Sequence, residues 1–377
     1  MARPQSTATQ RTIGEKLLGV QWPLLGLLCL LATVGITAQV AAGGGSFSPW
    51  ADKHALRFVL TLALVLAIAC TPLQWWIDIA YPVYAIALLL LMLVPYFGIE
   101  ALGARRWLGI GGVTFQPAEL MKVALVLMLA RYYQALRPDR VSSPLYVLVP
   151  LVLIALPVAL TLKQPDLGTA VLFGLVGVTL MYLAGVTVFY FIGGALAAVW
   201  AAPLVWSRLH DYQRRRVEIF LDPDKDPLGA GYHIAQSKIA LGSGGLSGRG
   251  FMQGTQSQLD FIPEKHTDFI FATLAEQWGF AGAMTLVALY VLVLALMITM
   301  ALRCRSQFAR LAIGGAGLIV FLYAFINIAM VTGIVPVVGV PLPLISYGGT
   351  SMTTIMVAVG IAMCAHVNRT TPVHRGG

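Results

Sequence analysis

Asp268 is the residue of this chain best placed for acid–base chemistry. It lies in residues 261–279, FIPEKHTDFIFATLAEQWG, where a long polar segment gives way to a hydrophobic run. The apolar residues Phe269, Ile270 and Phe271 follow it directly. Partial desolvation raises the pKa of a carboxyl group and strengthens the carboxylate as a base. The pattern therefore predicts a general base at a membrane–water boundary, the alternative being that Asp268 only caps the helix that follows.

A second pair of ionisable residues, Glu119 and Lys122, lies in the otherwise apolar run FQPAELMKVALV. Pro117 suits the first turn of a helix, and the three-residue spacing places both charges on one helix face. Charges inside a membrane cost several kcal/mol, so each is a candidate functional residue. Two interpretations stay open: the pair lines a polar cavity, where it orients a catalytic group or contacts substrate, or it is a buried ion pair that only fixes helix packing.

Arg105 and Arg106 lie in the motif GARRWLGIGG, just before that helix. The mixture of Gly, Arg and Trp predicts a loop or a short interfacial helix, with Trp107 at the level of the lipid headgroups. Guanidinium groups match the geometry of phosphate oxygens, so both arginines are candidates to bind a substrate phosphate. Contact with lipid headgroups is the alternative.

Two further segments carry candidate residues. Lys163 and Asp166 lie in LKQPDLGT, which predicts a short turn in which Asp166 either contacts substrate or caps the next helix. The uncharged run GIVPVVGVPLPLISYGGTSM is rich in proline and glycine, which prevent a continuous helix. Such backbone is tolerated at membrane depth only inside protein or along a cavity. It therefore predicts a substrate groove walled by Ser346, Tyr347, Gly348 and Gly349.

The composition indicates what must position these residues. Of the 377 residues, 58% are hydrophobic and 11% are charged, whereas soluble domains carry roughly 25% charged residues. A spanning helix needs about 20 mostly apolar residues, and open strands would leave backbone groups unpaired in lipid. The chain is thus predicted to be an all-α polytopic membrane protein. About ten spans of that length are expected to begin near Trp22, Phe58, Ile77, Pro117, Leu145, Leu167, Val188, Glu276, Leu311 and Ser351.

Arginine and lysine in the short segments predict the orientation. Such residues follow the fourth and eighth spans and occur in both terminal tails, which all fall on one side of the membrane. The positive-inside rule places that side in the cytoplasm. Residues 1–20 then form a cytoplasmic tail, and residues 208–275 form a large extracytoplasmic loop between the seventh and eighth spans. The stretch HIAQSKIALG in this loop has a helical rhythm and is expected to lie along the membrane surface. The net charge of +9 is a topology signal and gives no reason to expect nucleic acid as a partner.

The chain resembles the SEDS proteins, the polytopic peptidoglycan glycosyltransferases that include RodA, FtsW and SpoVE. The resemblance covers nearly the whole chain as a single SEDS-type transmembrane domain. It rests on the expected spans, the long outer loop, and the motifs GARRW, FQPAELMK, KQPDLGT, PEKHTDFIF and PLISYGGTS. The combination of DPLGAGYHIAQSKIALGSGG with GTQSQLDFIPEKHTDF resembles the RodA branch, which acts in elongation, more than the FtsW branch, which acts in division.

This resemblance implies polymerisation of lipid II into glycan strands at the outer face of the bacterial cytoplasmic membrane. The catalytic aspartate of the family corresponds to Asp268. The family's other polar motif residues correspond to Arg105, Arg106, Glu119, Lys122, Lys163 and Lys238. Asp268 would deprotonate the 4-hydroxyl of the acceptor sugar, and the cations would stabilise the departing pyrophosphate.

The resemblance also implies a partner, because no transpeptidase domain is present to crosslink the strands, and the family works with a class B penicillin-binding protein. No metal-ligand cluster stands out and no cofactor is evident, although a divalent cation such as Mg²⁺ is compatible with the reaction. Two other functions are considered: a lipid II flippase or transporter, since transporters also use intramembrane charges and broken helices, and a non-catalytic scaffold for cell-wall synthases.

Overall fold

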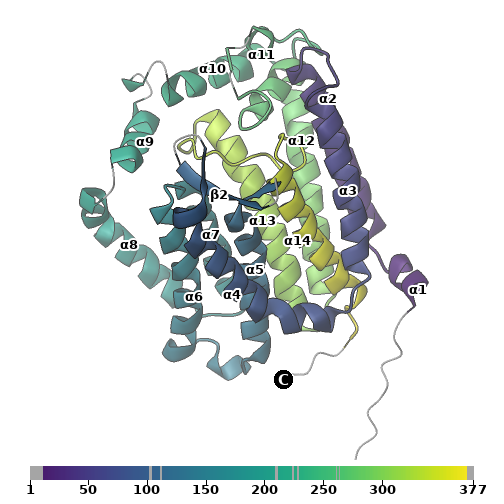
Figure 1. Cartoon of the computed structure of the whole chain (residues 1–377), viewed down its shortest axis with the longest axis vertical. Helices are drawn as coiled ribbons and strands as arrows, with labels where there is room; N and C mark the ends of the chain where they lie inside the picture. Colours follow the sequence, from purple (N-terminus) through teal and green to yellow (C-terminus); the bar gives the residue numbers. More distant parts are fainter. Residues whose placement is uncertain are drawn as a thin grey trace, which may run out of the picture.

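Long helices form almost the whole structure (Figure 1). The computed structural model describes residues 12–101, 104–110, 113–208, 211–222, 225–226, 229–259, 261–262 and 264–371. Among them, ten helices have 17 or more residues: α2 (Trp22–Ala42), α3 (Ala51–Ala69), α4 (Leu73–Phe97), α5 (Pro117–Ala135), α6 (Pro144–Lys163), α7 (Leu167–Leu183), α8 (Val188–Arg208), α12 (Ile270–Leu302), α13 (Gln307–Thr332) and α14 (Gly349–Val367).

These ten helices confirm the all-α polytopic architecture expected from the sequence. In the described part of the chain, six of them are long and apolar enough to cross a membrane by length and composition alone: α2, α4, α6, α12, α13 and α14. The apolar cores of α7 and α8 are shorter, and α3 and α5 each carry three charged residues. Two of the charges of α5, those of Glu119 and Lys122, are functional candidates from the sequence.

The core of the bundle is formed by α5, α13 and α14, whose side chains are buried on nearly all sides. α5 packs against α4, α7 and α13, while α14 packs against α3 and α13. A helix that is apolar all round is stable only where neighbours or lipid surround it. By contrast, α8 lies at one edge of the bundle (Figure 1), and its large apolar side chains are exposed, as expected for a helix that faces lipid.

A three-stranded antiparallel sheet replaces the loop or interfacial helix expected for GARRWLGIGG. Its strands are β1 (Ile99–Ala101), β2 (Ala104–Ile110) and β3 (Val113–Phe115), in the order β1-β2-β3. Glu100 pairs with Arg105, and Leu108 pairs with Phe115. The expectation was wrong because the chain reverses direction between α4 and α5. Hydrogen bonding of β2 to β1 and to β3 then satisfies the backbone groups of all three segments.

The large loop between α8 and α12 is itself mostly helical. It contains α9 (Asp211–Leu221), α10 (Ala230–Ser243) and α11 (Thr255–Gln258). α10 and α11 lie across one end of the bundle, and α9 stands beside it, between α8 and α10 (Figure 1). The helix α10 confirms the helical rhythm of HIAQSKIALG. The first turns of α12 are kinked at Gly279, whose φ of 68° is in the left-handed region, where glycine is at no disadvantage. A Cβ there would lie 2.3 Å from the backbone nitrogen of Gly248, so only glycine lets the loop pack so closely on α12.

The two ends of the bundle carry different residues. At the end opposite α10 and α11, Lys16 of the short helix α1 (Ile13–Leu18) donates to the carbonyl of Cys70 (2.8 Å). Arg305 bonds Arg369 through the backbone at that end (3.1 Å). Among the described residues that predict the cytoplasmic side, Lys16, Arg305 and Arg369 therefore lie at the end away from the loop that contains Asp268.

Candidate active site

A cavity of about 490 Å³ is lined by residues of elements at the end of the bundle that α10 and α11 cover. This volume is within the usual range for ligand sites. Seven parts of the chain line it: β2, the first turns of α5, α7 and α14, the middle of α13, the loop of residues 264–269 (the aspartate loop) and the loop of residues 333–348 (the proline loop). The lining includes Arg106, Glu119, Lys122, Asp166, Glu264, Asp268, Tyr323 and Tyr347.

Asp268 borders this cavity and is not the cap of α12. The helix begins at Ile270 with Phe269 in the capping position, and no side chain caps it, so the capping alternative is wrong. The carboxylate of Asp268 accepts no hydrogen bond from any residue that the structure describes. Burial, reinforced by the negative charge of Glu264, raises its pKa from 3.8 to about 6. These are the properties of a base that is mostly ionised at neutral pH and free to take a proton.

The proline loop lies directly against this carboxylate. Gly339 has a φ of +72°, and a Cβ placed on it would be 3.3 Å from Oδ2 of Asp268. A side chain at this position would press on the carboxylate and strain the backbone. The glycine therefore lets the proline loop approach Asp268 closely without blocking it.

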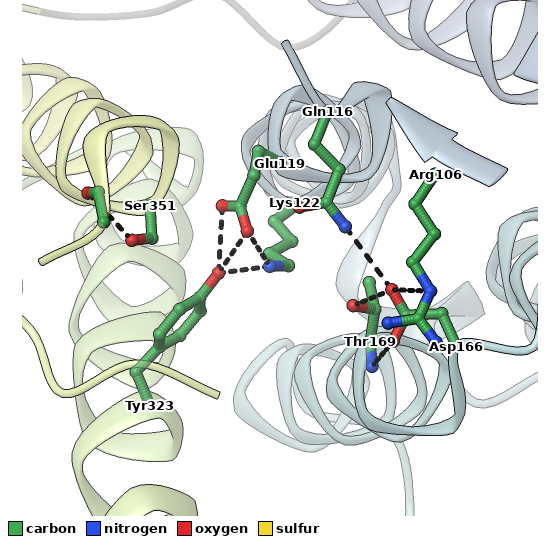
Figure 2. Close-up of polar contacts among 9 residues, drawn as sticks. Arg106, Gln116, Glu119, Lys122, Asp166, Thr169, Tyr323 and Ser351 are labelled. Atoms are coloured by element: carbon green, nitrogen blue, oxygen red, sulfur yellow. Dashed lines mark hydrogen bonds and ion pairs between the residues drawn. The ribbon is translucent and has the colours of Figure 1, made fainter. Parts of the chain in front are cut away.

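Glu119 and Lys122 form the ion pair that their spacing predicts, and they form it inside the protein (Figure 2). Nζ of Lys122 lies 2.7 Å from Oε1 of Glu119. Tyr323 of α13 completes the cluster, because its hydroxyl lies 2.9 Å from both Glu119 oxygens and also accepts a hydrogen bond from Lys122. Sequence reasoning missed Tyr323, since a single tyrosine in an apolar helix gives no signal.

A second polar cluster surrounds Asp166 on the same side of the cavity (Figure 2). Asp166 caps α7 by accepting from the backbone and hydroxyl of Thr169 (3.3 and 2.9 Å), which confirms the capping interpretation. Its Oδ2 also accepts from Gln116 (3.4 Å) and lies 4.0 Å from Nε of Arg106. Arg106 donates in addition to the carbonyl of Pro165. The arginine is thus held at the cavity wall by α7 and by the turn before it.

Four other candidates do not line this cavity. Arg105 is exposed and lies 3.8 Å from Glu100. Lys163 is exposed at the C-terminal end of α6, and the Lys238 side chain covers Gly333 at the C-terminal end of α13. Both lysines therefore occupy places where a helix dipole favours a cation. Ser346 is buried behind the wall, and its hydroxyl bonds the backbone of both loops.

The sequence of this chain matches a known family. The model of the family described as "Cell cycle protein", FtsW/RodA/SpoVE, matches residues 16–371. The chain belongs to the FtsW/RodA/SpoVE family. It is therefore a multi-pass membrane protein, and the resemblance to SEDS proteins is confirmed.

Relatives within the FtsW/RodA/SpoVE family include "Peptidoglycan glycosyltransferase MrdB" of Escherichia coli strain K12, 45% identical over 346 residues, which are 91% of this chain and 93% of MrdB. MrdB of Helicobacter pylori strain 26695 is 37% identical and covers 82% of this chain and 80% of its own length. The RodA structure of Thermus thermophilus is 26% identical, with a TM-score of 0.70 over 94% of this chain and 98% of that one. These similarities confirm the RodA-like branch.

A further solved structure has a TM-score of 0.81 and 31% identity over 94% of this chain and 99% of the other. It is described as "Structural coordination of polymerization and crosslinking by a peptidoglycan synthase complex". Among the described residues of this FtsW/RodA/SpoVE protein, no group of three or more His, Cys, Asp or Glu side chains is arranged to hold a metal ion.

Proposed function

We propose that this protein is a peptidoglycan glycosyltransferase that polymerises lipid II during cell elongation, with Asp268 as the general base. Its relatives carry that enzyme name. The observation that carries the residue assignment is the state of Asp268: a carboxylate on the cavity wall, with a raised pKa and no donor from the described residues. Buried carboxylates that accept several hydrogen bonds are stabilised as anions and are weaker bases.

The reaction follows from this placement. The Asp268 carboxylate takes the proton of the 4-hydroxyl of an incoming lipid II as that oxygen attacks the anomeric carbon of the growing strand. The bond between the anomeric carbon and the pyrophosphate oxygen breaks, and undecaprenyl pyrophosphate leaves with the bonding electron pair. One C–O bond forms, one breaks, and the configuration at the anomeric carbon inverts.

The departing pyrophosphate requires positive charge. Arg106 and Lys122 supply it within the cavity, while Arg105, Lys163 and Lys238 would act on substrate portions outside it. Among the described lining residues, two are cationic and four are acidic, a net charge of −2 with all of them ionised. Because that sum opposes an anionic substrate, a divalent cation such as Mg²⁺ would enter with the pyrophosphate rather than in a cage of protein ligands.

The enzyme acts at the outer face of the bacterial cytoplasmic membrane, with both termini in the cytoplasm. Arginines at the end of the bundle opposite the cavity support this orientation through the positive-inside rule. A class B penicillin-binding protein is the proposed partner. The similar solved complex that coordinates polymerisation and crosslinking supports an assembly of this kind.

Substitution of the base tests the assignment. Asp268→Asn keeps the size of the side chain but cannot accept the proton, so glycan polymerisation should fall by at least about 10²-fold. The measurement is the length and amount of glycan made from lipid II by purified protein with its partner. Asp222→Asn, which changes an exposed aspartate beyond α9, should polymerise as the wild type does.

The same variants separate the alternative functions. A flippase would move lipid II across vesicle membranes without lengthening glycan, and a scaffold would tolerate Asp268→Asn while the partner made glycan at the normal rate. Normal polymerisation by Asp268→Asn would therefore remove Asp268 from the mechanism.

A further inference from the structure

Three successive backbone carbonyls of the aspartate loop are each bound by a buried side chain from elsewhere in the chain. The carbonyls belong to the two residues before Asp268 and to Asp268 itself. The donors are Gln39 of α2 to His266 (3.0 Å), Ser346 of the proline loop to Thr267 (2.6 Å), and Asn327 of α13 to Asp268 (2.9 Å). All three donors are almost fully buried. Burial of polar side chains is costly unless they are hydrogen-bonded, so their shared target is a specific feature of this site.

The same three side chains also bind the proline loop. Each of them therefore links the aspartate loop to the proline loop. The second partners are the carbonyl of Ile345 for Gln39 (2.9 Å), the carbonyl of Val340 for Asn327 (2.7 Å), and the backbone N–H of Leu342, which donates to Ser346 (2.8 Å). The backbone N–H of Tyr347 adds a direct bond to the carbonyl of His266 (2.9 Å).

The position of the Asp268 carboxylate depends on these bonds, because no described residue holds the carboxylate itself. Its place is set by its own backbone and by Gly339 of the proline loop, which lies against Oδ2. On the chain's other side, Phe269 and Ile270 are anchored in the apolar core. A general base must be held within a fraction of an ångström to act efficiently.

We propose that Gln39, Asn327 and Ser346 form a carbonyl clamp whose role is to position Asp268 for proton transfer. These are positioning residues, since they touch the backbone of the base and no reacting atom. The clamp fixes the aspartate loop and the proline loop as one unit, so that the carboxylate faces the cavity at a constant distance from Gly339. This inference rests on the proposed function of Asp268, and it reassigns Ser346 from the substrate groove to the support of the base.

Loss of the clamp has a signature that simple destabilisation lacks. If the aspartate loop is released, the carboxylate of Asp268 can turn toward water. Its pKa then falls back toward the ordinary value of an aspartate, because burial is what raises it. The polymerisation rate should then fall while the acid limb of its pH profile moves to lower pH. The charged and titratable groups around Asp268 are Glu264, Lys265 and His266 on its own loop and, on the elements packed around the cavity, Arg106, Glu119, Lys122, Asp166, Tyr323 and Tyr347.

Asn327→Leu is the decisive variant, because it keeps the number and branching of the side-chain heavy atoms and removes both hydrogen bonds. We expect kcat for lipid II polymerisation to fall about 10–100-fold, with KM for lipid II little changed and the acid limb at lower pH. Gln134→Leu is the matched control. Gln134 is also a buried amide, and it accepts from the backbone of Phe308 (2.8 Å) at the far end of α13. This variant should lower thermal stability without changing kcat or the pH profile.

Two milder variants keep the test valid if Asn327→Leu does not fold. Ser346→Ala and Gln39→Leu should each lower kcat and move the acid limb to lower pH. Their double variant should change kcat by less than the sum of the two single effects in free energy, because both residues act through one loop. If folded Asn327→Leu or Gln39→Leu keeps the wild-type kcat and the wild-type acid limb, the proposal of the carbonyl clamp is wrong. Measured beside them, Asp268→Asn shows separately whether the base assignment itself stands.

Discussion

Glu119 and Asp268 are carboxylates on the wall of the same cavity, but their surroundings differ. Glu119 lies on α5 within 3 Å of a cation and a tyrosine hydroxyl, so its charge is balanced inside the bundle. Asp268 lies on the aspartate loop with its backbone held firmly and its carboxylate held by no described residue. Glu119 has a cation and a hydroxyl as direct partners, whereas Asp268 is kept in a place that disfavours its charge.

The difference explains how one cavity can contain both a stable charge pair and a reactive base. A carboxylate whose oxygens are occupied by donors cannot also accept a substrate proton, because its lone pairs are already used. The clamp satisfies the backbone of the aspartate loop and leaves the side chain free. The backbone of the aspartate loop is thus held by the clamp, while the carboxylate of Asp268 remains available to accept the proton.

Thermal stability should change in opposite directions when the two charges are removed. Glu119→Gln leaves Lys122, which is 3% exposed, as an uncompensated buried charge, and should destabilise the protein by about 3–5 kcal/mol. Asp268→Asn should stabilise it at pH 7 by on the order of 1–3 kcal/mol, because the ionised form is disfavoured only in the folded state. This gain should be present above pH 6 and vanish below about pH 4, where Asp268 is protonated in both states. Melting temperatures in detergent measure both effects.

A double variant decides between the two interpretations of the Glu119–Lys122 pair. Glu119→Gln combined with Lys122→Met removes both charges and should recover most of the lost stability. If this stable protein still fails to polymerise lipid II, the pair acts in the reaction. Full activity in the double variant would show that the pair only fixes the packing of α5 against α13.

Neighbouring arginines on β2 should differ in their effect on activity. Successive side chains of a strand point to opposite faces, so Arg106 lines the cavity while the side chain of Arg105 is 53% exposed. Arg106→Gln should lower kcat/KM for lipid II about 10–100-fold, the value of one charge-assisted hydrogen bond. Arg105→Gln loses a surface ion pair worth at most about 1 kcal/mol and should change kcat/KM less than about fivefold. Equal losses in both variants would contradict the assignment of Arg106 alone to the cavity.

The arginine pair also shows where sequence reasoning stops. Charge type and motif were enough to predict that Arg105 and Arg106 lie beside α5. The segment was expected to be a loop or a helix, and neither predicts that adjacent residues face opposite sides. The strand forms because β1 and β3 pair with β2, and pairing between separate segments is not visible in local composition.

The helices and the charged candidates were predictable for a physical reason. Apolar length reveals a spanning helix, and a charge in an apolar run is conspicuous, which identified Glu119, Lys122 and Asp268. Tyr323, Gln39 and Asn327 were missed because tyrosine, glutamine and asparagine carry no charge and occur singly in apolar helices. Their roles depend on contacts with residues 13–306 positions away in the chain, and only the folded structure brings those residues together.

The smallest predicted effect is a shift of the pH profile when the charge of Glu264 is removed. Since the base acts in its ionised form, the polymerisation rate should fall about tenfold per pH unit below the pKa of Asp268, which is about 6. The negative charge of Glu264 contributes to that value less than burial does. Glu264→Gln should therefore lower the pKa of Asp268 and move the acid limb to lower pH, by less than about one unit.

Two control variants make this shift interpretable. Burial lowers the pKa of His266 on the same loop, so His266→Gln should retain the acid limb if Asp268 is its source. Glu218→Gln changes a carboxylate on α9 that does not line the cavity and should leave the limb in place. An acid limb that disappears in His266→Gln, or that moves to higher pH in Glu264→Gln, would mean that Asp268 is not the titrating base. The contrast between a paired Glu119 and a free Asp268 would then be structural only.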